Sequence, residues 1–220
     1  MNSPLVRSIP CSVRPSTRLL RACAAFGLAV KRTRRRGPSP DHLADARDLH
    51  AALQPGQIAL ITGPSGSGKS SVLRALRRCS RRTSSIPAIR FRGTIVDALP
   101  GFTADALSVL ARAGLADAAL LARTPRELSE GERARFHLAL ALARAMPGET
   151  LLLDEFLSSL DRTTARNVAL SLRRWIDREG APRRLRIACA TAHDDVLDWL
   201  APEVLLVRDL ARPRGLLVSP

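Results

Sequence analysis

The run Gly63-Pro64-Ser65-Gly66-Ser67-Gly68-Lys69-Ser70 restricts the fold of this chain more than any other feature. It matches the spacing G-x-x-x-x-G-K-[ST] at every fixed position, between an apolar run, 57–62, and a helix-like stretch from residue 69. Glycines let successive N–H groups point into one concavity, and the N-terminus of a helix adds partial positive charge there. The motif predicts a loop that binds the phosphates of ATP or GTP, with Lys69 at the β- and γ-phosphates and the Ser70 hydroxyl on Mg²⁺. The following Ser71 is included among the expected nucleotide contacts.

Strand-like and helix-like segments alternate after residue 50, which is typical of parallel βαβ units. Short apolar runs predict buried strands at 57–62, 150–153, 185–190 and 203–207. Helical patterns with stop signals predict helices at 69–80, 104–113, 116–122, 130–145, 162–178 and 194–200, and 86–98 is read as a weak strand or a loop. The pattern therefore predicts an α/β fold of the P-loop NTPase type with a layered sheet.

Two acidic residues, Asp154 and Glu155, directly follow the apolar run Leu151-Leu152-Leu153. Ligands of a parallel sheet bind at the carboxyl ends of its strands, which is where these acids are expected. Asp154 is therefore a candidate ligand of Mg²⁺. Glu155 is a candidate general base for the water that attacks the γ-phosphate, a role worth about 10²–10⁴ in rate.

The segment Leu128-Ser129-Glu130-Gly131-Glu132-Arg133 opens the predicted helix at 130–145. Ser129 and Glu132 fit a capping box, which any helix can use. The capping box does not explain Gly131, because glycine is unfavourable in a helix unless something must approach its backbone. The segment resembles the signature motif of ATP-binding cassette (ABC) ATPases, with Glu130 and Glu132 where the commonest version of the motif has Gly and Gln.

Three further segments resemble parts of the same family and follow in its order. Ser158-Ser159-Leu160-Asp161 is similar to the D-loop, which contains Asp161 here. His193 follows a predicted strand and is similar to the histidine that contacts the γ-phosphate. Phe26-Gly27 is similar to the loop on which adenine stacks. The resemblance covers about residues 20 to 207 and places the first strand of the ATPase domain near residue 20.

The resemblance implies ATP and Mg²⁺ as ligands, ATP hydrolysis as the activity, and a head-to-tail dimer as the working unit. Each ATP would lie between the phosphate loop of one cassette and the signature segment of the other, where Ser129 and Gly131 would bind the γ-phosphate. The second cassette could be another copy of this chain or a different ABC ATPase. Catalytic roles would belong to Glu155, His193 and Lys69.

The sequence departs from the family's pattern in two ways. Its only glutamines, Gln54 and Gln57, precede the phosphate loop, so the family's Q-loop glutamine has no counterpart. Asp97 is a candidate substitute near the metal, although an ordinary exposed acid is an equal reading. Only 60 positions separate Lys69 from Ser129, so the helical subdomain is expected to be abbreviated.

The N-terminal 40 residues form a separate basic segment, expected to be partly flexible, ahead of an ATPase domain at 41–220. They hold nine cationic side chains and no acidic one, out of a formal charge of +15 for the chain. Four scattered cysteines argue against a zinc ribbon or a disulfide framework. No apolar run approaches the ~18 residues of a membrane helix, so a cytoplasmic protein is expected.

Three functions remain open. The first is a soluble ABC ATPase that drives conformational change in an unknown effector, favoured by the missing glutamine and the short helical region. The alternatives are the ATP-binding subunit of an ABC membrane transporter, with a permease partner, and a P-loop kinase for a small molecule or nucleotide. Basic clusters at 31–36, 74–82 and 183–186 leave nucleic-acid binding open as well. The alternative explanation of these clusters is a general preference of this chain for arginine.

Overall fold

The computed structural model describes residues 8–11, 13–32, 38–80, 82–85 and 91–218. The chain divides into two compact units, Met1–Ser39 and Pro40–Pro220, which are described separately. The basic cluster at 31–36 falls largely outside the described residues.

The first unit is a small β-α-β element. Strand β1 (Ser8–Cys11) pairs in parallel with β2 (Ala29–Arg32), and helix α1 (Thr17–Ala25) connects them. The Ser16 hydroxyl caps α1 by accepting the N–H of Leu19 at 3.2 Å. The sequence placed a first strand of the ATPase domain near residue 20; the structure has a helix there, and its two neighbouring strands pair with each other rather than with the main sheet.

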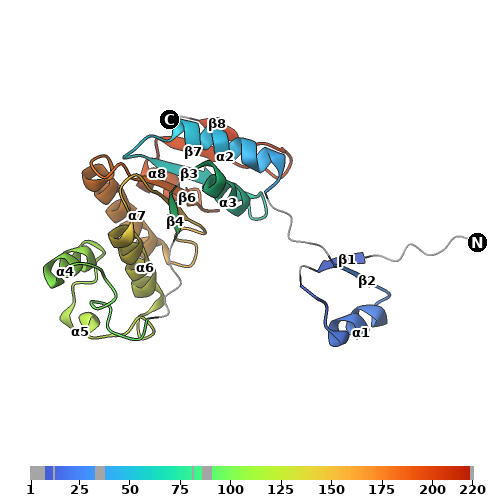
Figure 1. The fold of residues 1–220 in the computed structure, drawn as a ribbon, viewed down its shortest axis with the longest axis horizontal. Helices are drawn as coiled ribbons and strands as arrows, with labels where there is room; N and C mark the ends of the chain where they lie inside the picture. Colours follow the sequence, from blue (N-terminus) through green and yellow to red (C-terminus); the bar gives the residue numbers. More distant parts are fainter. Residues whose placement is uncertain (1–7, 12, 33–37, 81, 86–90, 219–220) are drawn as a thin grey trace, which may run out of the picture. The chain divides into compact units, whose positions relative to one another are not determined.

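The second unit is built on a six-stranded sheet in the order β4-β5-β6-β3-β7-β8 (Figure 1). Every neighbouring pair is parallel except β7 and β8, which are antiparallel. Its strands are β3 (Ile58–Thr62), β4 (Thr83–Ser85), β5 (Thr150–Leu153), β6 (Arg186–Ala190), β7 (Val204–Val207) and β8 (Leu216–Val218). Strands β3 and β5 are neighbours of β6 on its two sides, so their carboxyl ends meet at one edge.

Helices cover both faces of this sheet (Figure 1). Alternate residues of a strand point to opposite faces, so Ile58 and Leu60 of β3 join one core and Ala59 and Ile61 join the other. The first core is closed by α6 (Glu130–Arg144), α7 (Arg162–Trp175), its π-helical extension η1 (Ile176–Gly180) and α8 (Val196–Leu200). The second is closed by α2 (Pro40–Ala52) and α3 (Lys69–Cys79).

A third, smaller core lies under the short helices α4 (Thr103–Arg112) and α5 (Ala118–Leu121). Its centre is Phe136 of α6, which is fully buried among Ile95, Leu110 and Leu115. Helix α6 therefore belongs to two cores and joins this helical part to the sheet. None of the helices in the described part of the chain is long and apolar enough to cross a membrane.

The predicted strands and helices after residue 50 match the structure to within a few residues, but some elements of the second unit were not predicted. Helix α2 and strands β4 and β8 are missing from the sequence prediction, and η1 was counted as ordinary helix. The stretch 86–98, read as a weak strand or a loop, carries no strand from residue 91 on, and residues 86–90 lie outside the described residues.

Candidate functional site

The loop between β3 and α3 turns at three glycines with positive φ: Gly63 (135°), Gly66 (84°) and Gly68 (91°). Such angles strain any residue that has a side chain. Space is restricted too, because a Cβ on Gly63 would lie 2.0 Å from the carbonyl oxygen of Arg208, and one on Gly68 would lie 2.4 Å from Nε2 of His42. The loop therefore needs glycine at both ends, and α3 starts directly after it at Lys69.

The Lys69 ammonium folds back over this loop. Its Nζ donates to the carbonyl oxygens of Gly63 at 2.6 Å and Pro64 at 2.8 Å. Partial burial lowers the pKa of Lys69, and the carboxylates of Asp154 and Glu155 act in the opposite direction. The cation is therefore held at the loop by two carbonyl groups, and its charge faces the two acids that follow β5.

Ser70 and Asp154 come together from different elements. The Ser70 hydroxyl, in the first turn of α3, donates to Oδ1 of Asp154 at 2.8 Å, and the N–H of Glu155 donates to the same oxygen at 3.1 Å. Hydroxyl and carboxylate oxygens are the ligands that Mg²⁺ prefers. Both oxygens are therefore suitable ligands for one magnesium ion, which would take the place of the hydrogen bond between them.

Glu155 stands on a turn with unusual backbone angles. Its φ is 50° and that of Leu157 is 63°, in the left-handed region that non-glycine residues seldom occupy. The N–H of Phe156 donates to the carbonyl of Ala190 at 2.8 Å and ties this turn to β6. Backbone strain of this kind persists where the surroundings fix it, and it gathers at functional sites.

These residues surround one open cavity of about 500 Å³. Eight of the predicted site residues line it, together with the unpredicted Ser158, Ala190, Thr191 and Ala192. Gly63, Pro64 and Ser67 do not line it, and Ser67 is buried. The eight predicted residues are Ser65, Gly66, Gly68, Lys69, Ser70, Ser71, Asp154 and Glu155.

The predicted signature segment lies at the N-terminus of α6 and does not line this cavity. Ser129 and Glu132 form the predicted capping box: the Glu132 carboxylate accepts the Ser129 N–H at 2.8 Å, and this bond lowers the pKa of Glu132. Glu130 is exposed. A Cβ on Gly131 would lie 3.4 Å from Thr164, an ordinary contact, so packing within the chain does not require a glycine there.

Two other predicted residues are held by local hydrogen bonds. Asp161 caps α7 by accepting the N–H of Thr164 at 2.9 Å, and hydrogen bonds from the side chain and backbone of Thr164 lower the pKa of Asp161. His193 is half-buried, and its N–H donates to the Thr191 hydroxyl at 3.2 Å. Thr191 and Ala192 line the cavity, whereas His193 follows them without lining it.

Phe26 and Asp97 have different surroundings from the predicted ones. Phe26 follows α1 in the first unit, where its side chain is 79% exposed. Asp97 accepts hydrogen bonds from the N–H of Thr94 at 3.2 Å and from its hydroxyl at 2.6 Å. Asp97 therefore closes a local turn and does not line the cavity.

A buried ion pair behind the loop was missed by the sequence analysis. Arg208, just after β7, is 4% exposed and donates to Asp45 of α2, which is 1% exposed, at 2.5 Å. Nε of Arg208 also donates to the carbonyl of Ser67 at 3.0 Å. Charged groups are almost never this buried unless they are paired. The pair therefore holds the phosphate loop, through the carbonyl of Ser67, against α2 and the end of β7.

Comparisons with known proteins point to one family. A sequence model of the ABC transporter family matches residues 46–98. The hemin import ATP-binding protein of Pseudomonas entomophila is 34% identical over 174 residues, which are 61% of this chain and 68% of that protein. The aliphatic sulfonates import ATP-binding protein of Delftia acidovorans is 32% identical over 183 residues, 74% of this chain and 73% of that protein.

The fold is also similar to that of solved structures. A dimeric ATP-binding cassette in a post-hydrolysis state with ADP and Pi has a TM-score of 0.54 to this chain and 19% identity. The match covers 71% of this chain and 83% of the cassette. At this identity the likeness concerns the fold alone, and it confirms the predicted fold class of an ABC-type P-loop NTPase.

Proposed function

This chain belongs to the ATP-binding cassette family, whose domains bind and hydrolyse ATP, and from that premise we propose that it is the ATP-binding subunit of a membrane importer. The sequence alone favoured a soluble ATPase without a permease. The relatives are import subunits by name, so they support the transporter alternative better. They also give no support to the kinase alternative.

The part of the proposal that concerns ATP binding rests chiefly on one observation: Lys69, Ser70, Asp154 and Glu155 surround a single cavity at the carboxyl edge of the sheet. The triphosphate of ATP would lie on the glycine loop, where Lys69 would exchange its two carbonyl partners for phosphate oxygens. A charge-assisted hydrogen bond of this kind is about twice as strong as a neutral one. Ser70 and Asp154 would hold Mg²⁺, which neutralises charge on the phosphate oxygens when bound.

Glu155 is proposed as the general base. Its carboxylate lines the same cavity as Lys69 and Ser70, and its backbone is fixed through Asp154 and through the neighbouring Phe156. A carboxylate next to the γ-phosphate would accept a proton from the attacking water as the oxygen–phosphorus bond forms. His193, one residue beyond the cavity lining, is proposed to contact the γ-phosphate after a small rearrangement of its loop.

A second copy of this chain is proposed to complete the site. The solved dimeric cassette supports an assembly of two such domains. Ser129 and Gly131 at the N-terminus of α6 would bind the γ-phosphate held by the other copy, where the positive end of the helix dipole favours an anion. Gly131 supports this proposal because internal packing does not explain why a glycine stands there. Asp161 would lie near the same interface.

The first testable prediction concerns Lys69. Lys69→Ala removes the only lysine of the loop and one charge-assisted phosphate contact, worth about 1.5–3 kcal/mol. We expect affinity for ATP, measured by isothermal titration calorimetry, to fall at least tenfold. Lys31→Ala, the other lysine of the chain, is the matched control and is expected to leave the affinity unchanged. Equal affinities of Lys69→Ala and the parent chain would contradict the assignment of the loop.

The permease partner is proposed from the relatives, and it would place the subunit at the cytoplasmic side of a membrane. Co-purification in Mg²⁺ and ATP would test it: a polytopic membrane protein is expected to accompany the chain. Recovery of the chain with a soluble protein alone would return the function to the soluble alternative.

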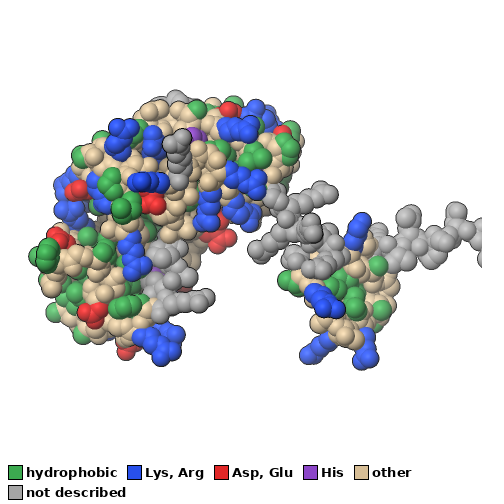
Figure 2. All heavy atoms as spheres, viewed as in Figure 1, with side chains coloured by type: hydrophobic (Ala, Val, Ile, Leu, Met, Phe, Trp, Pro, Cys, Tyr) green, Lys and Arg blue, Asp and Glu red, His purple; other side chains and the backbone are tan. Residues whose placement is uncertain are grey.

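Nucleic-acid binding receives less support from the charges of the second unit. In Figure 2 the Lys and Arg side chains are scattered over the visible face of this unit rather than gathered into one patch. Two arginines of the predicted cluster at 183–186 are used inside the fold: Arg183 donates to the carbonyl of Ala145 at 2.5 Å, and Arg186 donates to that of Leu53 at 3.0 Å. These two guanidinium groups therefore have part of their donors occupied within the fold.

A further inference from the structure

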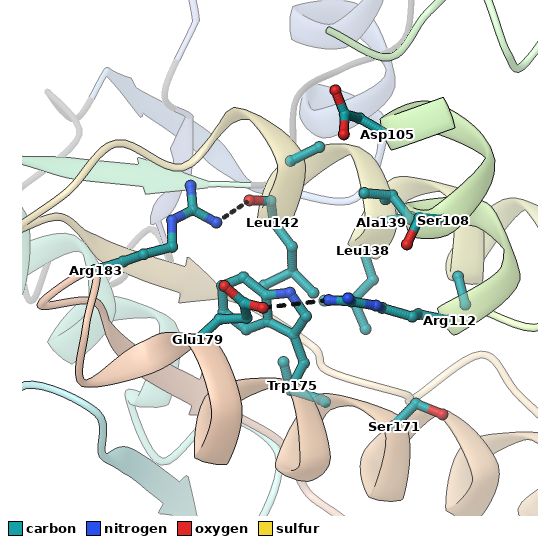
Figure 3. A pocket seen from close by; sticks show the side chains of 14 residues that line it. Asp105, Ser108, Arg112, Leu138, Ala139, Leu142, Ser171, Trp175, Glu179 and Arg183 are labelled. Carbon is teal, nitrogen blue, oxygen red and sulfur yellow. Dashed lines mark hydrogen bonds and ion pairs between the residues drawn. The ribbon is translucent and has the colours of Figure 1, made fainter. Parts of the chain in front are cut away.

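A second hollow lies between α4, α6 and α7 and shares no lining residue with the nucleotide cavity (Figure 3). Its volume is about 230 Å³. One face of α4 lines it, through residues at helical spacing from Asp105 to Arg112, together with the C-cap residue Ala113. Small side chains, among them Ala139 of α6 and Ser171 of α7, leave the space open.

The floor of this hollow is apolar. Leu138 and Leu142 of α6 and Leu172 and Trp175 of α7 form it, and the indole ring of Trp175 lies at its centre in Figure 3. Ligand sites for small molecules have this character: mostly apolar walls with a few polar groups that fix orientation. The floor suits an alkyl or aryl group.

Charged side chains stand around the floor. Arg183 lies over the Trp175 ring, 5.6 Å from its centre, and donates to the carbonyl of Ala145 at 2.5 Å, so its position is fixed. Arg112 crosses the opening to Glu179 of η1 in a loose ion pair of 3.4 Å between side chains that are 51% and 39% exposed (Figure 3). Exposed pairs of this kind contribute about 0–1 kcal/mol, so a ligand anion can compete for Arg112.

A smaller cavity of about 210 Å³ adjoins this hollow and shares Arg112, Ser171 and Trp175 with it. Arg174 and Arg178 complete its lining. Three guanidinium groups therefore surround this cavity, and no acidic side chain lines it in the described part of the chain. The carboxylates of Asp105 and Glu179 belong to the lining of the larger hollow alone. Arg178 stands on the π-helix η1, and π-helical turns are frequent at functional sites.

We propose that the two cavities form one binding site for an amphiphilic phosphate, an alkyl or aryl phosphate monoester. Its apolar part lies on Leu142 and Trp175, and its phosphate is bound by Arg112, Arg174 and Arg178. Arginine matches phosphate because its fork of donors binds two oxygens at once, and a phosphate monoester carries close to two negative charges and three acceptor oxygens at neutral pH. A carboxylate offers fewer acceptors to three guanidinium groups.

Trp175 provides the readout. The chain holds two tryptophans, so the full-length Trp199→Phe variant reports on Trp175 alone. Titration of this variant with octyl phosphate, below its micelle-forming concentration and at low salt, is expected to give a saturable change in emission. Octan-1-ol, which lacks the charge, and inorganic phosphate, which lacks the chain, are each expected to bind at least tenfold more weakly.

Variants in the same background locate the site. Arg112→Gln removes a guanidinium, and Ala139→Phe fills the hollow. Each is expected to weaken binding of octyl phosphate at least fivefold. Arg166→Gln, an exposed arginine of α7 outside both cavities, is the matched control and should change nothing. Lys69→Ala should also leave the signal in place; its loss there would put the phosphate in the nucleotide loop.

Each contrary outcome overturns the proposal. Equal binding of octan-1-ol would show an apolar hollow without a phosphate site, and equal binding of inorganic phosphate would show surface charge alone. An unchanged titration of Arg112→Gln would show that the ligand binds elsewhere. Arg112 lies on the surface, so this variant is expected to fold and tests the site even if Ala139→Phe does not fold.

Discussion

Glu155→Gln is expected to lower ATP turnover by about 10²–10⁴ while leaving ATP binding intact. The substitution keeps the size of the side chain and removes its ability to accept a proton, which is the contribution of a general base to rate. The contacts proposed for Lys69, Ser70 and Asp154 with the phosphates and Mg²⁺ do not depend on this carboxylate, so affinity for ATP should stay within about threefold of the parent value. Steady-state phosphate release and equilibrium binding of ATP measure the two quantities on the same preparation.

Asp198→Asn is a suitable control for this prediction. Asp198 is an exposed carboxylate of α8 that does not line the nucleotide cavity, and its substitution also removes one negative charge. Turnover of the control should equal that of the parent chain. If Glu155→Gln also turned over at the parent rate, another group would have to be the base.

The second large effect is expected from the buried ion pair behind the loop. Asp45→Asn leaves the Arg208 guanidinium buried without a counter-charge, and removal of one partner from a buried pair costs about 3–5 kcal/mol. Arg208 keeps its bonds to the carbonyls of Ser67 and Pro213, so the lower end of that range is expected. Urea denaturation followed by circular dichroism gives the change in the free energy of unfolding.

Asp48→Asn is the matched control, because it makes the same chemical change on the same helix. Asp48 pairs with Arg214 at the surface, where its side chain is 53% exposed, and a surface pair is worth about 0–1 kcal/mol. A loss of stability that is equal for the two variants would show that the buried pair is not a special support of the phosphate loop.

The parts of this fold that were predictable carry strong local signals. The glycines of the phosphate loop are required by positive φ and, at Gly63 and Gly68, by close contacts. The four predicted strands are apolar because both faces of the sheet are covered. Ser70 and Asp154 were each expected at the same metal, and they lie together because β3 and β5 end at the same edge of a parallel sheet.

The elements that were missed depend on contacts between distant parts of the chain. Helix α2 has a weak apolar pattern, and the partners of its buried Asp45 (Arg208, Arg214 and Gly215) all lie more than 160 residues later in the chain. Strand β4 reads Thr-Ser-Ser and pairs with β5 at the edge of the sheet, without an apolar residue to mark it. In the N-terminal unit, Phe26 was expected to stack on adenine because of its resemblance to a nucleotide loop. The local sequence from Ser16 on forms a capped helix instead, and Phe26 follows its last turn.

The most direct test of the whole account is the mass of the ATP-bound particle. Sedimentation velocity of Glu155→Gln in Mg²⁺ and saturating ATP is expected to show a dimer that reverts to single chains when ATP is removed. Adding Gly131→Ala should abolish this dimer, because a methyl group blocks the approach of phosphate to α6. The fold tolerates that methyl group, which has an ordinary contact with Thr164 and improves helix propensity by up to about 1 kcal/mol. Single chains at every ATP concentration, or a dimer indifferent to Gly131→Ala, would contradict an ATP shared between two cassettes.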